Sequence, residues 1–245
     1  MYISTNPDAE SSTTVSSDGI SYFIQMLSNN SINLIDTSRM SIISTFDNIL
    51  DQPSVVCRPL GAIYLEHYDQ MVALFESSNK FYLAAKKSVK GLRYCFELVP
   101  MRGYQRQTFY PACLSKTIND DFIVIGGSDS RESRMGNAVL TIYKIDESLQ
   151  SIDSLILQGK DKKKLMTVNC INRLSGNNMF VAGAFGSIFV VEWNGISLSM
   201  ISYYSMKHTC RMLLTVGLVT QISCTRDSFY SVCANDKYVF CDKII

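Results

Sequence analysis

Basic side chains are concentrated in the polar segments that separate the apolar runs of this chain. Arginine forms bidentate pairs with carboxylates and phosphates, and arginine and tyrosine are frequent anchors at protein interfaces. These segments therefore predict a surface for an acidic or phosphorylated peptide, with ordinary solvated loops as the alternative. Nucleic acid is a weaker alternative, because RNP-like aromatic motifs are absent. The residues that we expect to bind are Arg58, Arg102, Tyr104, Arg106, Arg131, Arg134, Lys162, Lys163 and Arg211.

Catalytic patterns are missing from the sequence. Glu66 precedes His67 directly, so on a strand their side chains point to opposite faces, and no Gly-x-Ser-x-Gly accompanies the histidines. Gly126–Gly127 is followed by no Gly-Lys-Thr, so we interpret it as a turn at a strand end rather than a phosphate loop. The acids Glu66 and Asp69, like Asp120 and Asp121, are expected to be solvated turn residues. We predict no catalytic residue, no cofactor and no metal.

The cysteines and the charge balance point to a reducing compartment without a strong electrostatic target. The chain has 8 cysteines, no C-x-x-C pair and a formal net charge of +1. Most of the cysteines lie in apolar runs, where a thiol acts as a small hydrophobe. The N-terminal segment has no basic and apolar signal pattern, and 212–225 is too short and interrupted to cross a bilayer. We expect a cytoplasmic or nuclear protein with no membrane span.

Short apolar runs separated by polar turns predict an all-β chain. The clearest pair is 179–193, where two apolar runs flank Gly183, Gly186 and Ser187. Four-strand sets follow one another along the chain, and we expect them to form one domain over 20–245, preceded by a polar, weakly ordered segment at 1–19. The first set is expected to lack its inner strand and the last its outer strand. The predicted sets cover 20–46, 60–99, 109–157, 167–204 and 213–245.

The sets repeat one another. An offset of 50 residues superposes Phe180 on Tyr230 and Ala182 on Val232 without a gap. In addition, Ala62, Cys113 and Cys170 each lie nine residues before the start of the next strand, at Met71, Phe122 and Met179. We interpret these small residues as equivalent positions on inner strands. Four-stranded antiparallel sets that recur every ~40–50 residues are typical of a β-propeller.

The segment 180–193 resembles a WD40 repeat, with small residues closing one strand, then Gly-Ser, then an apolar strand that ends in Glu192–Trp193. The Gly-His and Trp-Asp dipeptides of that family are absent. The segment 122–145 instead resembles a kelch repeat, with FIVIGG followed by NAVLTIYKI. These resemblances imply a β-propeller of about five four-stranded antiparallel blades, with a β-sandwich pair as the alternative fold.

A WD40-like propeller implies a non-enzymatic scaffold that presents its loops to other proteins, as a subunit of a larger complex. Two alternatives stay open. One is a propeller-type glycoside hydrolase, which needs two carboxylates at the axis. The other is an open propeller completed by a strand from a partner protein. Closure within the chain itself is the other solution, in which residues near Tyr2–Ser4 pair with the last set.

Overall fold

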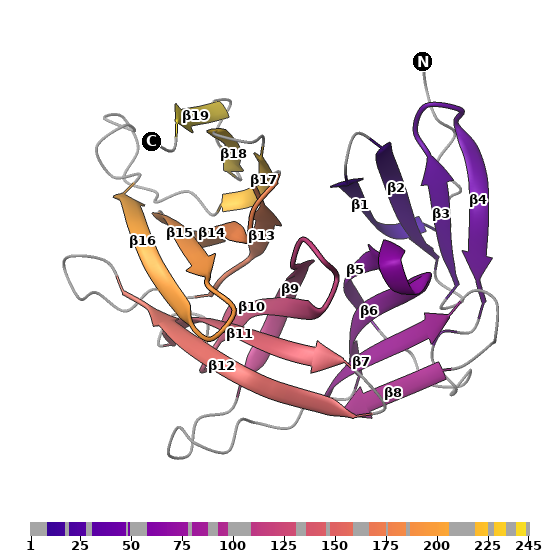
Figure 1. Cartoon of the computed structure of the whole chain (residues 1–245), viewed down its shortest axis with the longest axis horizontal. Helices are drawn as coiled ribbons and strands as arrows, with labels where there is room; N and C mark the ends of the chain where they lie inside the picture. Colours follow the sequence, from indigo (N-terminus) through magenta and orange to yellow (C-terminus); the bar gives the residue numbers. More distant parts are fainter. Residues whose placement is uncertain are drawn as a thin grey trace. The chain divides into compact units, whose positions relative to one another are not determined.

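The structure is a computed structural model (Figure 1). Two compact units make up the chain, Met1–Leu98 and Val99–Ile245, and each is described by itself below. The residues that the structure describes are 9–17, 20–27, 31–47, 49, 58–77, 80–87, 93–97, 109–130, 136–145, 148–158, 167–174, 176–184, 187–205, 219–224, 228–233 and 239–243.

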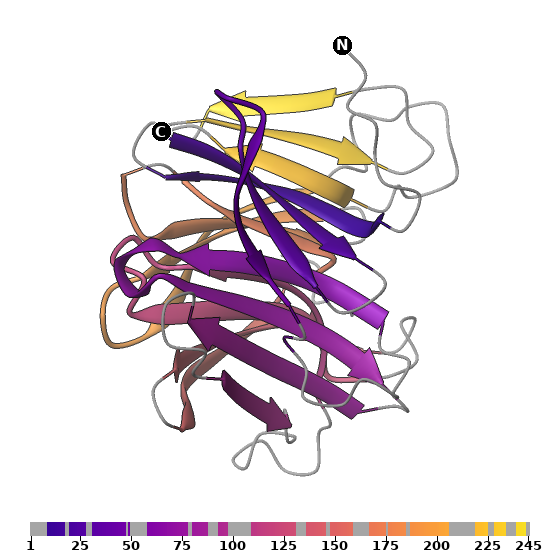
Figure 2. The same ribbon diagram turned by 90° about the vertical axis from the view of Figure 1, so that its right-hand side faces the viewer.

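The first unit consists of two four-stranded antiparallel sheets, each with its strands in chain order. Figure 2 shows the strands of each sheet side by side and twisted, as strands of L-amino acids normally are. A short 3-10 helix, η1 (Glu66–Tyr68), joins β5 to β6. The strands are β1 (Ala9–Ser17), β2 (Ile20–Leu27), β3 (Ile32–Asp36) and β4 (Ser41–Phe46), then β5 (Arg58–Leu65), β6 (Gln70–Ser77), β7 (Lys80–Lys87) and β8 (Arg93–Glu97).

Strand β1 corrects two predictions at the N-terminus. Residues 9–17 are not a weakly ordered segment, and the first sheet is not short of a strand, because β1 pairs with β2 over its length. Its sequence, AESSTTVSS, has no apolar run, so hydrophobic patterning did not reveal it. The backbone pairing starts at Ser17 and Ile20. Pairing with the apolar strand β2 therefore accounts for β1, although β1 itself is polar.

The second unit contains two four-stranded sheets and a three-stranded sheet, again antiparallel and in chain order. Within the described residues the last sheet has three strands. The strands are β9 (Tyr110–Lys116), β10 (Phe122–Ser128), β11 (Ala138–Ile145), β12 (Leu149–Leu157), β13 (Cys170–Arg173), β14 (Met179–Ala184), β15 (Ser187–Trp193), β16 (Leu198–Ser205), β17 (Val219–Cys224), β18 (Ser228–Cys233) and β19 (Val239–Lys243).

The register of the hairpins confirms the repeat at an offset of 50. Phe180 pairs with Val191 in the β14–β15 hairpin, and Tyr230 pairs with Cys241 in the β18–β19 hairpin. Ala182 pairs with Phe189, and Val232 with Val239. Each pair in one hairpin thus lies 50 residues from the same pair in the other. The two hairpins are copies of one structural unit.

The predicted equivalence of the small inner residues holds for two of the three. Cys113 pairs with Gly126, and Cys170 pairs with Gly183. Ala62 pairs with Ala73 and is shifted by one position toward the hairpin. The reason is the hairpin itself, since the β5–β6 connection is shorter than the connections after β9 and β13.

First strands of successive sheets contact one another within each unit. Strand β5 contacts β1 in the first unit, and β13 contacts both β9 and β17 in the second. The fourth strands β12 and β16 also contact each other. Within each unit, successive sheets therefore lie with first strand beside first strand, and in the second unit the fourth strands β12 and β16 also lie side by side.

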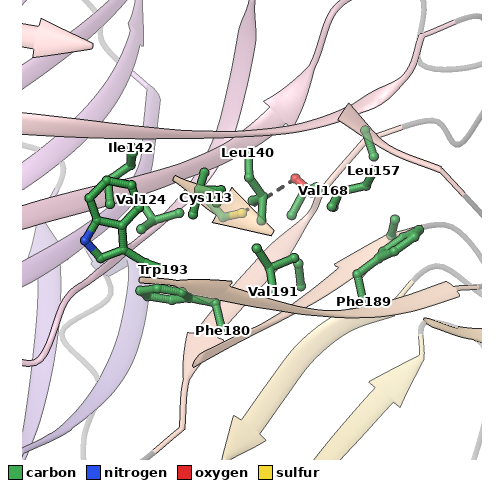
Figure 3. Close-up of a cluster of buried hydrophobic side chains, with 14 residues drawn as sticks. Cys113, Val124, Leu140, Ile142, Leu157, Val168, Phe180, Phe189, Val191 and Trp193 are labelled. Carbon is green, nitrogen blue, oxygen red and sulfur yellow. Dashed lines mark hydrogen bonds between the residues drawn. The ribbon is translucent and has the colours of Figure 1, made fainter. Parts of the chain in front are cut away.

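Large apolar side chains fill the space between the stacked sheets. In the second unit, Phe180, Phe189 and Trp193 on the β13–β16 sheet are buried with Leu140 and Ile142 of the β9–β12 sheet (Figure 3). Burying each such side chain stabilises the fold by roughly 1.5–3 kcal/mol. The first unit has its own cluster, in which Met26, Ile32 and Phe46 pack with Met71 and Phe75.

Candidate functional site

Arg58 is the one member of the predicted binding set that lies within the described residues. It opens β5, its side chain is 77% exposed, and its Nη1 lies 3.6 Å from Oε2 of Glu76 on the paired strand. An exposed ion pair of this kind contributes only about 0–1 kcal/mol, so the guanidinium group stays accessible to a ligand. The other eight residues lie outside the described part: Arg102, Tyr104, Arg106, Arg131, Arg134, Lys162, Lys163 and Arg211.

The base of the β10–β11 connection, which carries Arg131 and Arg134 in its sequence, is tightly held. Both carboxylate oxygens of Asp129 accept hydrogen bonds of 2.6 Å from Asn137, one from its backbone N–H and one from its side-chain amide. The N–H of Asp129 donates in turn to the carbonyl of Asn137 at 3.2 Å. Charge-assisted bonds of this length are the stronger ones. The two ends of the connection are therefore clamped together.

Gly136 packs closely against the residues next to Asp129. A Cβ atom at Gly136 would lie 2.1 Å from Oγ of Ser128 and 2.9 Å from Cβ of Ser130. Ser128 is buried at the end of β10, and its Oγ accepts a hydrogen bond from the N–H of Ser130. A larger residue at Gly136 would thus push against the clamped base. The arrangement holds residues 128–130 close against Gly136 and Asn137.

The double glycine of the kelch-like segment is a packing device and not a turn. Gly126 and Gly127 lie inside β10, which continues to Ser128. A Cβ at Gly126 would come within 2.6 Å of Val168 and 2.8 Å of Cys113, and a Cβ at Gly127 within 2.1 Å of the carbonyl of Tyr110. The carbonyl of Gly127 accepts a hydrogen bond from the N–H of Val168. Only glycine lets the segment before β13 approach this closely.

The turn between β9 and β10 contains a charged pair that the sequence did not reveal. Nζ of Lys116 lies 2.8 Å from Oδ1 of Asp120, and the two side chains are 6% and 2% exposed. Asp120 was expected to be a solvated turn acid, and this expectation is wrong. Its backbone has a φ of +61°, and its N–H donates to the carbonyl of Thr117, so the turn folds its carboxylate back onto the strand that carries Lys116. The pair is structural.

A hydrogen bond from the same turn links two sheets. The N–H of Ile118 donates to Oδ1 of Asn178 at 2.8 Å, and the carbonyl of Asn178 accepts from the N–H of Trp193. Asn178 belongs to the β13–β14 connection, so corresponding turns of neighbouring sheets are linked. The spacing of Lys116 and Asp120 was the one sequence signal for this site.

The acids and the histidine around residue 66 lie in or next to the short helix η1. Asp69 has a φ of +46° and accepts a 2.6 Å hydrogen bond from the hydroxyl of Tyr64. Glu66 and His67 lie in η1, so their relation is helical and not the alternation of a strand. The described residues contain no group of three or more His, Cys, Asp or Glu side chains able to hold a metal ion.

Cys113 and Cys170, on the first strands β9 and β13, are reduced. Cys113 is buried, and its Sγ donates a weak hydrogen bond of 3.5 Å to the carbonyl of Val168. Burial raises the pKa of the Cys113 thiol well above its ordinary value, and the nearby Cys170 thiol raises it further. A thiol with a raised pKa is a poor nucleophile. Cys113 is therefore a packing residue.

In the part of the chain that the structure describes, no helix has both the length and the apolar character to cross a membrane.

Comparisons with known proteins identify the fold. The chain resembles the β-propeller domain of Cps50 (Swd1) from Myceliophteria thermophila, with a TM-score of 0.59 and 10% identity over 91% of this chain and 66% of that one. It also resembles the WD40 repeats of RRP9, with a TM-score of 0.56 and 11% identity over 89% of this chain and 58% of that one. No protein-family model and no curated protein matches the sequence.

A third solved structure is a complex of Atg21 with the coiled coil of Atg16, with a TM-score of 0.54 and 8% identity over 95% of this chain and 65% of that one. At these identities the likeness concerns the fold alone, and it is a WD40-type β-propeller fold. The chain spans about two thirds or less of the solved chains that it matches.

Proposed function

We propose that this chain is a non-enzymatic WD40-like scaffold that binds other proteins as a subunit of a larger complex, in the cytoplasm or the nucleus. Its five sheets are the blades of one propeller domain. The observation that carries the proposal is the repeated four-stranded unit with chain-order strands, combined with the likeness to WD40 domains. One of these solved relatives was captured with a coiled coil of another protein, which supports a protein partner here.

The binding surface in this proposal is formed by the basic connections between sheets and between second and third strands. These connections share one end of a propeller, and the clamp of Asp129 and Asn137 supports one of them. Arginine side chains on a rigid base suit an acidic or phosphorylated peptide, because the guanidinium group binds carboxylate or phosphate with two hydrogen bonds. Arg58, already exposed beside Glu76, belongs to the same set.

Charge reversal tests this surface. The variant Arg131→Glu/Arg134→Glu is expected to weaken binding of a fluorescent phosphoserine-Glu-rich peptide at least tenfold, measured by anisotropy at low salt. Lys144→Glu is the matched control, since Lys144 is an exposed basic residue at the opposite end of β11. Equal affinity of the double variant and the wild-type chain would refute the proposed surface. Weak binding by both variants would show a non-specific charge effect and would refute it as well.

A strand donated by a partner is a second candidate function, and the three-stranded last sheet favours it. Strand β19 pairs with β18, and within the described residues no strand covers its other edge. An unpaired edge is a template for β-augmentation. In the isolated chain, amides of β19 that face outward are then expected to exchange with deuterium far faster than those of β18. Equal protection of both strands would mean that the chain completes its own sheet and would exclude a donated strand.

A further inference from the structure

Exposed apolar side chains gather on the outer strands of the second unit. Ile152 on β12 is 42% exposed, Met200 and Ile201 on β16 are 42% and 51% exposed, and Ile196 in the turn before β16 is 82% exposed. We call these four residues the rim patch. Strands β12 and β16 contact each other, and Figure 1 shows them as the outermost strands of their sheets.

A hydrogen bond fixes the two halves of the rim patch relative to each other. The N–H of Leu198 donates to Oδ2 of Asp153 at 2.7 Å. Asp153 follows Ile152 directly, and Leu198 lies two residues from both Ile196 and Met200. With about 3.8 Å between successive Cα atoms, the Cα atoms of Ile196 and Met200 lie at most about 8 Å from that of Leu198, and that of Ile201 at most about 11 Å. The hydrogen bond and the contact of β12 with β16 therefore bring the exposed apolar residues of the two strands into one region of the second unit.

Both outer strands carry a β-bulge within the rim patch, and an isoleucine is the extra residue in each. The pairing of β11 with β12 passes from Asp153 to Ser151 and leaves out Ile152. The pairing of β15 with β16 passes from Ser202 to Met200 and leaves out Ile201. A bulge bends the strand and interrupts its hydrogen-bond ladder, which protects an edge from strand addition. A ligand of the rim patch therefore binds through side chains.

The size and the chemistry of the rim patch restrict its ligand further. Its exposed apolar area is on the order of 300–400 Å², comparable to the largest patch on a typical monomer. A stable dimer buries about 800 Å² on each partner. The rim patch is therefore too small to hold a second copy of the chain by itself. Charged residues lie on the paired strands, where Lys144 pairs with Gln150 and Glu192 pairs with Ser199. The carboxylate of Asp153 is engaged by Leu198. Apart from Asp153, the polar residues next to the patch along its own strands and turn are uncharged. They are Gln150, Ser151, Asn194 and Ser199.

We infer that the rim patch binds the apolar face of a short amphipathic helix of a partner protein. Two to three helical turns present an apolar stripe of this size at positions i, i+3, i+4 and i+7. The inference extends the proposed scaffold function to a second surface, separate from the basic connections. A helix on the rim patch and an acidic peptide on the basic surface then contact different residues.

Selection of displayed peptides on the full-length chain tests the inference. From a library of 14-residue helical peptides, the selected sequences are expected to carry apolar residues at i, i+3 or i+4, and i+7. The variant Ile152→Asp/Ile201→Asp is expected to bind a synthesised selected peptide at least tenfold more weakly. Ile43→Asp is the matched control, because Ile43 is also an exposed bulge residue, 52% exposed on β4, and it should bind as the wild type does.

The outcomes separate this inference from the proposed basic surface. Equal binding of the selected peptide to the double variant and the wild type would overturn the inference, as would equal loss in the Ile43→Asp control. Selection of extended peptides only, from a parallel non-helical library, would overturn it too. The variant Arg131→Glu/Arg134→Glu is expected to bind the helical peptide as the wild type does. The proposals for the basic surface and for the rim patch can therefore fail independently of each other. Unchanged thermal midpoints of the isoleucine variants confirm that they remain folded.

Discussion

Replacement of Asp120 by asparagine is expected to lower the free energy of unfolding by about 3–5 kcal/mol, the usual cost of breaking a buried ion pair by removing one partner. The side chains of Asp120 and Lys116 are almost fully buried, and Oδ1 of Asp120 lies 2.8 Å from Nζ of Lys116. Asparagine has the same shape and tolerates the left-handed backbone of this position, where φ is +61°. The loss therefore comes from the uncompensated lysine charge. Urea unfolding followed by circular dichroism gives the value.

A double variant distinguishes charge from shape at this pair. Lys116→Met/Asp120→Asn removes both charges and is expected to recover much of the stability lost in the single variant, because no uncompensated buried charge is left. A single Asp120→Asn variant within 1 kcal/mol of the wild type would contradict the structural role. So would a double variant no more stable than the single one.

Replacement of Trp193 by alanine is expected to cost a similar amount, about 3–5 kcal/mol. Trp193 is 4% exposed at the end of β15, and its ring meets the ring of Phe122 edge-on, with centroids 5.4 Å apart. The two rings belong to different sheets, so the substitution opens a cavity where the sheets stack. Edge-on aromatic pairs add about 0.5–1.5 kcal/mol beyond the area they bury. Equilibrium unfolding by circular dichroism measures the loss.

Trp193→Phe is the control for the aromatic contact. Phenylalanine keeps an aromatic ring in the cluster and fills more of the space than alanine does. It is expected to be clearly more stable than Trp193→Ala, with an unfolding midpoint between those of alanine and the wild type. If Trp193→Ala unfolded at the wild-type urea concentration, the packing of the β9–β12 sheet against the β13–β16 sheet would be wrong.

The sequence predicted most of the strands because their signal is local. In β10, β11, β14 and β15, apolar runs are bounded by turn residues, and the structure places buried strands there. Strand β1 escaped prediction because its nine residues are polar and the pairing with β2 specifies it. A strand that forms because its neighbour pairs with it needs no alternating apolar pattern of its own.

Features of the candidate sites depended on register and turn geometry, which composition does not contain. The partner of Arg58 is Glu76, and this pairing follows from the register of β5 on β6. The contact of Asp120 with Lys116 depends on one left-handed residue in a short turn. The exposed isoleucines of the rim patch are visible only once the bulges in β12 and β16 are known. The sequence indicated which polar segments connect the strands. The contacts that fix the ends of these segments became visible only in the structure.

A crystal structure of the full chain tests the central proposal, that the five sheets are blades of one WD40-like propeller scaffold. The proposal predicts a radial arrangement about one axis in which the first strand of every sheet, β1, β5, β9, β13 and β17, lies innermost. The contacts of β13 with β9 and β17, and of β5 with β1, would then be steps of one ring. Two layers of sheets packed face to face, with first strands at separate edges, would contradict it and establish a β-sandwich pair.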